Sequence, residues 1–297
     1  MRNHRRGESP AFRAIGFIVV IAATLFCFVP LLLIVSGSFT ENQALMRNGY
    51  GLFPSEFSLE AYAFILKMPA GIARSYVNTI IVTALGTAIG LLCITMTSYV
   101  LQRKDFKYRN SIAFLIYFTT IFGGGLVPWF ILLSKYLGMQ NTYMARLLPL
   151  LMTPFLIFLM RTFIQTTVPV EMVESAKIDG AGDFRIYRSI VMPTITPGLA
   201  TVGLFLALTY WNDWYLTSLF ITKSKMYSLQ YYLYDILNSI RFAQEMAAQS
   251  GTVVLENMPT ESIKMAMVVV VTGPVVFLYP FVQRYFVSGL TIGSVKG

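Results

Sequence analysis

The sequence predicts an all-α, polytopic membrane protein with six transmembrane helices and both termini in the cytoplasm. Hydrophobic residues make up 56% of the 297 residues and charged residues only 12%, whereas soluble domains carry about 25% charged residues. The charges also lie in short segments between long uncharged stretches, as membrane topology requires. These observations exclude a soluble domain. They also assign the net charge of +9 to membrane topology rather than to nucleic-acid binding.

Each expected span is a largely uncharged stretch of roughly 20 residues, the length that a helix needs to cross the hydrocarbon core. Glycine and proline interrupt several of them, notably at residues 123–128, and the freed backbone groups must be satisfied by neighbouring helices or by water in a cavity. The fourth stretch is the weakest, and Arg146 and Arg161 are expected to extend toward the interface at its ends. The six stretches are residues 14–36, 75–101, 111–134, 142–162, 196–222 and 262–283.

The distribution of Lys and Arg sets the expected orientation. Four arginines precede the first span and four basic residues follow the second, whereas the segment after the third offers little beyond Lys135. Because cytoplasmic loops carry the excess of positive charge, both termini are expected inside the cell. Residues 1–13 are then a cytoplasmic segment and residues 14–297 a single transmembrane domain. Segments 37–74 and 223–261 are expected outside, as folded caps with short interfacial helices.

The most informative segment is residues 168–193, between the fourth and fifth spans. Pro169 suits a first helical turn, two glutamates complement the positive end of a helix, and Gly180 permits the chain to stop and turn. Apolar residues within 184–191 then begin a second helix. The segment is therefore expected to form a helix, a turn and a helix at the inner face of the membrane.

At this segment the chain resembles the permease subunits of type I ABC importers, whose signature is Glu-Ala-Ala, three residues, Gly, nine residues and Ile-x-Leu-Pro. Five positions are in register with it: Glu174, Ala176, Gly180, Ile190 and Pro193. Ser175 replaces the central alanine and Met192 the leucine. Further stretches at 124–128, 137–143 and 210–214 look like landmarks of the carbohydrate branch, of the maltose-permease type and its complex-oligosaccharide subgroup. The resemblance covers nearly the whole chain, with a core at about 72–285.

The resemblance implies that segment 168–193 docks as a coupling helix in a cleft of a separate ATPase and transmits its closure to the membrane helices. Glu174 would pair with a basic group on the ATPase, and Gly180 would permit a tight approach. A solvated interfacial helix without a partner is the alternative. The residues implied in coupling are Glu171, Glu174, Ser175, Ala176, Asp179, Gly180 and Ala181.

The resemblance also implies the partners of the chain in a bacterial cell membrane. They are a second, homologous permease, two copies of an ABC ATPase and an extracellular sugar-binding protein, with an oligosaccharide as the expected substrate. ATP and Mg²⁺ would bind the ATPase, so no cofactor is expected here. The sequence itself has no phosphate-binding loop, no metalloprotease motif and one histidine, and we therefore expect neither a catalytic nor a metal site.

A cluster near the end of the fifth stretch is the candidate substrate path. Aromatic faces can stack on sugar rings, and amide or carboxylate oxygens can accept hydrogen bonds from hydroxyls. Asp213 is expected within the span, where an ionisable residue is costly and usually faces a partner or a water-filled cavity. Two alternatives stay open, an interfacial aromatic belt and an Asp213 that only bonds a neighbouring helix. The cluster comprises Tyr210, Trp211, Asn212, Asp213 and Trp214.

A competing function is an ion- or proton-coupled secondary transporter that works without an ATPase. Such a protein needs buried acids or a coupling-ion site, and many are built from inverted repeats. Only Asp213 lies clearly within an expected span, and no repeat is visible in the sequence. The sequence therefore favours the importer permease.

Overall fold

The computed structural model describes residues 10–67, 69–250 and 260–292, and these residues are predominantly helical, as predicted. The only β pairing among them is an isolated bridge between Thr40 and Phe57. Of the predicted cytoplasmic segment 1–13, residues 1–9 lie outside the described residues.

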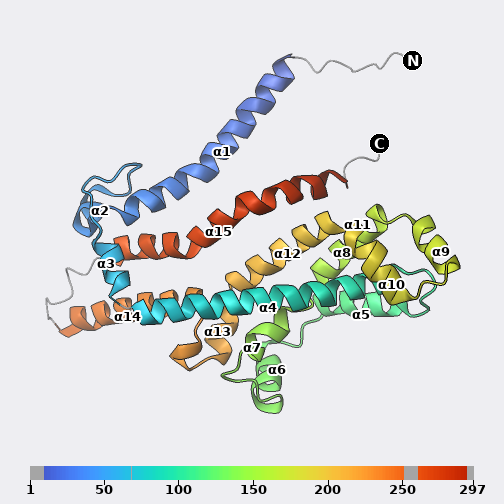
Figure 1. Cartoon of the computed structure of the whole chain (residues 1–297). Coiled ribbons are helices and arrows are strands. Elements are labelled where there is room, and N and C mark those ends of the chain that lie inside the picture. Colours follow the sequence, from blue (N-terminus) through green and yellow to red (C-terminus); the bar gives the residue numbers. More distant parts are fainter. Residues whose placement is uncertain (1–9, 68, 251–259, 293–297) are drawn as a thin grey trace. The chain divides into compact units, whose positions relative to one another are not determined.

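The helices follow the sequence in the order shown in Figure 1. The α-helices are α1 (Pro10–Ser38), α2 (Asn42–Asn48), α3 (Glu60–Leu66), α4 (Pro69–Gln102), α5 (Arg109–Ile121), α6 (Leu126–Ile131), α7 (Met144–Leu147), α8 (Pro154–Thr167), α9 (Val170–Ile178), α10 (Asp183–Ile186), α11 (Met192–Thr194), α12 (Thr196–Trp211), α13 (Tyr215–Phe220), α14 (Leu229–Ser250) and α15 (Thr260–Ile292). Shorter elements are the π-helices η1 (Leu132–Tyr136) and η3 (Tyr187–Val191) and the 3₁₀ helices η2 (Leu148–Leu150) and η4 (Ser224–Met226).

Among the described residues, three helices are long and apolar enough to cross a membrane: α1, α4 and the first part of α15. They coincide with the first, second and sixth predicted stretches. Three bent pairs of helices raise the number to as many as six if each pair is one span.

The predicted third stretch contains the sharpest break. Helix α5 and the α6–η1 helix meet at 113° across residues 122–125, where Gly125 has a φ of +85°. The glycine run was predicted to interrupt a helix, and this is confirmed. The angle is so large, however, that the stretch is not one straight crossing. A milder bend of 48° separates α7–η2 from α8 in the fourth stretch.

The prediction for the fifth stretch was wrong at its end, because α12 stops at Trp211 rather than continuing to residue 222. The Asp213 side chain explains the break. Its Oδ1 accepts a hydrogen bond of 2.9 Å from the backbone N–H of Leu216, in the first turn of α13. A side chain that satisfies the first amide groups of a new helix competes with continuation of the old one. Asp213 therefore lies between two helices and not within a span.

The chain forms two compact units, Met1–Pro69 with Ile236–Gly273 and Ala70–Asp235 with Pro274–Gly297. In the first unit, the predicted short helices of segment 37–74 are present as α2 and α3. Asn42 in α2 binds the start of α15, where its Oδ1 accepts hydrogen bonds of 3.0 and 3.3 Å from the N–H groups of Glu261 and Ser262. In segment 223–261, by contrast, α14 has 22 residues and is not a short helix.

In the second unit, α12 packs against α8 and, at two glycines of α4, also comes very close to α4. A Cβ atom on Gly86 would lie 2.4 Å from the ring of Tyr210, and one on Gly90 would lie 2.5 Å from Leu206. Glycines permit such an approach of two membrane helices. Behind this contact, α8 and η3 complete a core in which Met160 and Val191 are fully buried.

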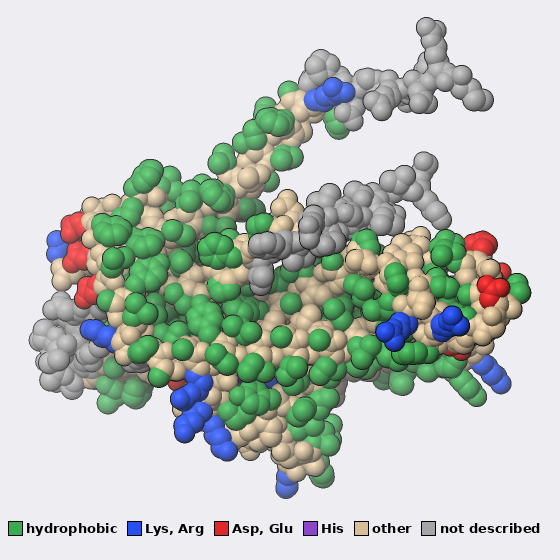
Figure 2. Space-filling model, in the orientation of Figure 1, with side chains coloured by type: hydrophobic (Ala, Val, Ile, Leu, Met, Phe, Trp, Pro, Cys, Tyr) green, Lys and Arg blue, Asp and Glu red, His purple; other side chains and the backbone are tan. Residues whose placement is uncertain are grey.

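The long helices present hydrophobic side chains on their exposed faces, as contact with lipid requires. Helix α5 buries none of its residues, and Phe114, Phe118 and Phe122 form a continuous row of ring contacts along it. On the face shown in Figure 2, hydrophobic side chains cover the helices, and acidic and basic side chains gather around α9 and α10.

Candidate functional site

Helix α9 and the elements after it form the expected helix, turn and helix. Pro169 immediately precedes the first helical residue, and Glu171 lies in the first turn. The helix ends in a Schellman motif. The N–H of Ala181 donates to the carbonyl of Ala176 at 2.9 Å, and that of Gly180 donates to Lys177 at 3.0 Å. The residue that follows the C-cap in this motif adopts a left-handed conformation, and Gly180 has a φ of +77°.

A glycine at position 180 could be required for lack of space or for its backbone conformation, and the structure distinguishes these two reasons. A Cβ atom at this position meets no atom of this chain within 4 Å, so a side chain would not clash within the chain itself. The positive φ alone is unfavourable for other residues. The expected tight approach to an ATPase remains a prediction, because it concerns atoms outside the chain.

Helix α9 lies on the surface of the second unit. Val173 and Ala176 pack against the edge of the core, but none of the residues of α9 is buried. Ile178 is 87% exposed, and Phe184 after the turn is 65% exposed. Both apolar side chains lie beside charged residues, on the surface that was expected to meet an ATPase; that contact stays a prediction.

Four of the predicted coupling residues line one shallow pocket. The pocket has a volume of about 460 Å³, is widely open, and lies between α9 and η3. The remaining three lie elsewhere: Gly180 and Ala181 form the turn, and Glu174 projects from another side of α9. The residues that line this pocket are Glu171, Met172, Ser175, Ala176, Asp179 and Ile190.

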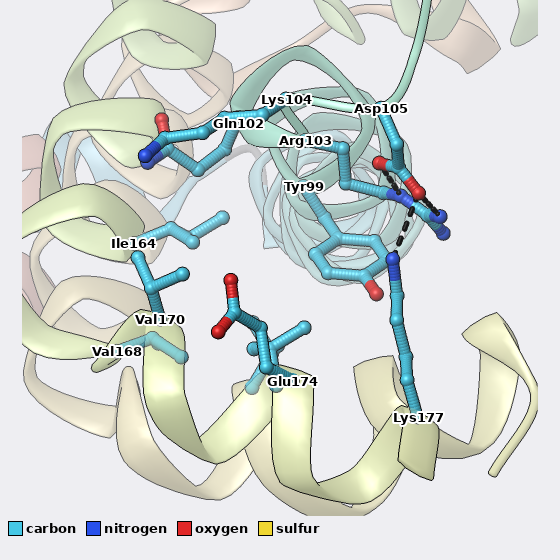
Figure 3. Close-up of a pocket in the computed structure, with 12 residues that line it drawn as sticks. Tyr99, Gln102, Arg103, Lys104, Asp105, Ile164, Val168, Val170, Glu174 and Lys177 are labelled. Carbon is cyan, nitrogen blue, oxygen red and sulfur yellow. Dashed lines mark hydrogen bonds and ion pairs between the residues drawn. The ribbon is translucent and has the colours of Figure 1, made fainter. Parts of the chain in front are cut away.

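Glu174 lines a second, more enclosed pocket of about 200 Å³ between α9, the ends of α4 and α8, and η3. Figure 3 shows its carboxylate directed into this pocket, toward the space between Gln102 and Tyr99. The carboxylate makes no hydrogen bond or ion pair with any described residue. Glu174 is exposed, and its carboxylate is free to meet a basic group of another protein; the expected pairing with such a group stays a prediction.

A network of charges that the sequence analysis missed connects the same pocket to the loop after α4. Lys177 Nζ lies 2.8 Å from Asp105 Oδ2, and Arg103 Nε donates to Asp105 Oδ1 at 2.9 Å. Arg103 also pairs with Asp183, the first residue of α10. The hydrogen bond from Arg103 and then that from Lys177 lower the pKa of Asp105, so its carboxylate stays ionised. The sequence indicated Arg103 only as a topology signal, because no spacing rule predicts that Asp105 meets Lys177, 72 positions away.

The predicted substrate cluster is divided by the fold. Tyr210 is fully buried, with its hydroxyl donating to the carbonyl of Leu147 at 2.7 Å, and Trp211 is buried as well. Asn212 and Trp214 are exposed and line an open pocket of about 390 Å³ with Asp213. Trp129 from α6 and Tyr215 from α13 add two more aromatic side chains, which sequence reasoning did not identify.

The Asp213 carboxylate is occupied by internal contacts. Its Oδ2 lies 3.4 Å from Nε of Arg146 and accepts a hydrogen bond of 3.4 Å from the hydroxyl of Thr217. Arg146 was expected to extend toward the membrane interface, and this was wrong, since its side chain is fully buried. Burial removes both charges from water, and the pairing with Asp213 compensates part of that cost. The alternative that Asp213 bonds a neighbouring helix is thus what the structure shows.

The described residues contain no group of three or more His, Cys, Asp and Glu side chains that could hold a metal ion. These residues instead offer two surfaces for contacts with other molecules, a charged helix–turn–helix and an aromatic pocket, and packed helices connect the two.

Comparison with known proteins identifies the family. Residues 106–292 match the model of the binding-protein-dependent transport system inner membrane component. The chain belongs to this family of transport permeases. The permease is therefore a multi-pass component of the bacterial cell membrane and is not itself an enzyme. The reading as an ABC importer permease is confirmed over that of a secondary transporter.

The similar proteins match along nearly their whole length. The polygalacturonan/rhamnogalacturonan transport system permease protein YtcP of Bacillus subtilis (strain 168) is 35% identical over 282 residues, which cover 95% of this chain and 96% of that protein. The arabinooligosaccharides transport system permease protein AraQ of Halalkalibacterium halodurans is 29% identical over 95% of each chain. Among solved structures, a chain of a bacterial ABC transporter involved in import of the acidic polysaccharide alginate superposes with a TM-score of 0.79 at 26% identity, covering 96% of this chain and 100% of that chain.

Proposed function

We propose that the permease forms half of the membrane channel of an ABC importer that carries an oligosaccharide into the cell. The similar proteins are named for the transport of arabino-oligosaccharides, polygalacturonan or rhamnogalacturonan, and the solved structure belongs to an alginate importer. Neutral and acidic glycans both occur in these names. The shared class is a sugar chain, and the individual sugar is to be found by experiment.

The observation that carries the proposal is helix α9, a surface helix that buries none of its residues and exposes Glu171 and Ile178, followed by the exposed Asp179. A rigid helix that ends in a defined turn can transmit a displacement, whereas a mobile loop absorbs it. Glu174 and the open pocket beside Ser175 offer a charged and a shallow apolar contact to the partner. The partner is an ABC ATPase, and α9 is the coupling helix.

A permease that forms half of a channel and does not itself hydrolyse ATP needs further protein components. A second, homologous permease completes the channel, and two copies of the ATPase bind ATP and Mg²⁺ and hydrolyse ATP. An extracellular sugar-binding protein delivers the substrate to the outer segments. In this arrangement residues 14–297 act as one transmembrane domain, and the chain itself holds no cofactor.

The sugar path is proposed to use the open aromatic pocket. Trp214 is about half exposed, and Asn212 beside it offers an amide to sugar hydroxyls. Trp129 and Tyr215 provide further apolar faces on which rings can stack. Tyr210, Trp211 and Asp213 are proposed to hold this pocket in place rather than to touch the sugar.

Purification of the assembled complex tests the function. The tagged permease should bring down a second permease and an ATPase, and sugar-loaded binding protein should stimulate ATP hydrolysis by the complex in nanodiscs. A panel of labelled oligosaccharides, neutral and uronate-containing, then identifies the substrate by binding to the cognate binding protein. A permease that purifies without an ATPase and transports sugar alone would contradict the proposal.

A further inference from the structure

The loop after α4 contacts the helix–turn–helix on both sides of its turn. On the α9 side, Asp105 forms an ion pair with Lys177, with 2.8 Å between Oδ2 and Nζ. On the α10 side, Arg103 pairs with Asp183, and the same Arg103 is hydrogen-bonded to Asp105. The four charges alternate in sign, so each has an opposite charge beside it. Figure 3 shows Arg103, just after the end of α4, and Lys177 of α9 both reaching Asp105.

Deeper in the same unit, α4 also holds η3. The hydroxyls of Thr95 and Tyr187 are hydrogen-bonded at 2.7 Å in the buried interior, and the rings of Tyr99 and Tyr187 lie 5.6 Å apart. The guanidinium of Arg103 lies 5.9 Å from the centre of the Tyr99 ring. Residues 95–105 thus contact the helix before the turn, the first residue after it, and the next helical turn.

These contacts matter because α4 is not a covalent neighbour of the helix–turn–helix. The chain connects α9 to α8 and η3 to α12, whereas α4 lies some 70 residues earlier in the sequence. A displacement of α9 reaches α8 and α12 along the backbone but reaches α4 only through side chains. Near the surface, that connection consists of Lys177, Asp105, Arg103 and Asp183.

We propose that Asp105 is a positioning residue that joins the coupling helix α9 to α4, so that movement of α9 is transmitted to α4 together with α8 and α12. This inference rests on the proposed coupling role of α9. It assigns a function in transport to the loop after α4, which otherwise serves as a topology signal. Asp105 needs no contact with the ATPase or with the sugar for this role.

The charges of the network argue against a purely accidental contact. Exposed ion pairs contribute little to stability when they are isolated, but here one carboxylate receives two cations from different elements. The hydrogen bonds from Arg103 and Lys177 lower the pKa of Asp105, so the network persists across the cytoplasmic pH range. Its loss is therefore expected to affect the connection between elements more than the fold.

The test compares Asp105→Asn and Lys177→Met with the unaltered chain in purified complexes. The Asp105→Asn variant, whose altered residue lies outside α9, should assemble with the ATPase and retain basal hydrolysis. Stimulation by the sugar-loaded binding protein and sugar uptake should both fall, within the roughly 2- to 30-fold range by which substitutions along a coupled network change coupling. Lys177→Arg keeps the charge and should restore most of the stimulation. Lys107→Met is the matched control, since Lys107 lies in the same loop and its side chain lies over the ring of the adjacent Tyr108 rather than in the charge network.

Three results would overturn the inference. Full stimulation and uptake in both variants would show that the network transmits nothing. Dissociation of the ATPase would show a role in docking rather than in transmission. Failure of Lys177→Arg to differ from Lys177→Met would show that the charge is irrelevant. If the unaltered chain itself binds no ATPase, the proposed function fails first, and this outcome is visible before any variant is measured.

Discussion

The guanidinium of Arg146 and the carboxylate of Asp213 form an ion pair in the interior of the second unit, with 3.4 Å between Nε and Oδ2. Arg146 comes from α7, after the break at residues 137–143, and Asp213 from the break between α12 and α13. Each residue lies where a helix starts or stops. The pair therefore connects two irregular segments that would otherwise leave charges alone in an apolar region.

Removal of one partner should destabilise the permease strongly, because the other charge is left buried. We expect Arg146→Met and Asp213→Asn each to lower the free energy of unfolding by about 3 to 5 kcal/mol. Thermal unfolding of the purified complex in detergent measures this effect. The double variant should lose less than the sum of the two. A loss equal to that sum would show that the two charges do not interact.

Substitution of Gly180 should impair transport through the backbone rather than through contacts in this chain. Its φ of +77° disfavours β-branched residues, so Gly180→Val should cost about 1 to 3 kcal/mol of local strain and reduce uptake severely. Gly180→Asn should be milder, since Asn adopts this conformation more readily. Uptake of labelled sugar at equal membrane levels is the readout. Gly182→Ala is the control, because Gly182 has a φ of −70°, and an equal loss there would contradict the argument.

Close packing of α4 on α12 predicts sensitivity at Gly86. An alanine Cβ there would lie 2.4 Å from the Tyr210 ring, so the helices must separate. Overpacking of this kind costs about 1 to 3 kcal/mol and should lower the unfolding temperature and the yield of assembled complex. Gly16→Ala, at a position with no atom within 4 Å of the added Cβ, should change neither. Unchanged stability of Gly86→Ala would mean that this contact is looser than described.

Substitutions in and beside the aromatic pocket should affect either uptake or assembly, depending on whether the side chain is exposed or buried. Trp214→Ala and Asn212→Ala should raise the KM for uptake while leaving the amount of assembled complex unchanged, because both side chains are exposed. Trp211→Ala should reduce assembly, since Trp211 is buried. Transport kinetics and co-purification of the ATPase distinguish the two effects. Normal KM values for both exposed variants would remove this pocket from the sugar path.

The predicted topology can be tested by cysteine labelling in intact cells. After replacement of Cys27 and Cys93, an impermeant thiol reagent should modify Ser55→Cys but should modify Lys107→Cys only after the cells are permeabilised. The expectation rests on the excess of basic residues in the loop after the second stretch. The opposite pattern would invert the orientation of the permease.

The sequence alone determined the class of the protein and the location of its coupling segment. Composition and uncharged length fix a helical membrane protein, because backbone groups in lipid must be bonded within the helix. The spacing from Glu174 to Gly180 and Pro193 identified the helix–turn–helix, since a helix stop and a turn depend on residues that are near one another in the chain. Both features are local, and local patterns can be read without a structure.

Only the tertiary structure decided how distant residues pair. Arg146 and Asp213 are separated by 67 positions and Asp105 and Lys177 by 72, and no periodicity indicates that either pair meets. The end of α12 also depends on contacts between distant residues, because Asp213 is bonded to both Arg146 and the start of α13. Tyr210 and Trp214 look equivalent in the sequence, yet packing against α4 buries one and leaves the other at an open pocket. A charged or aromatic side chain can pair with many different partners. Which partner it meets, and therefore its role, depends on the three-dimensional arrangement of the chain.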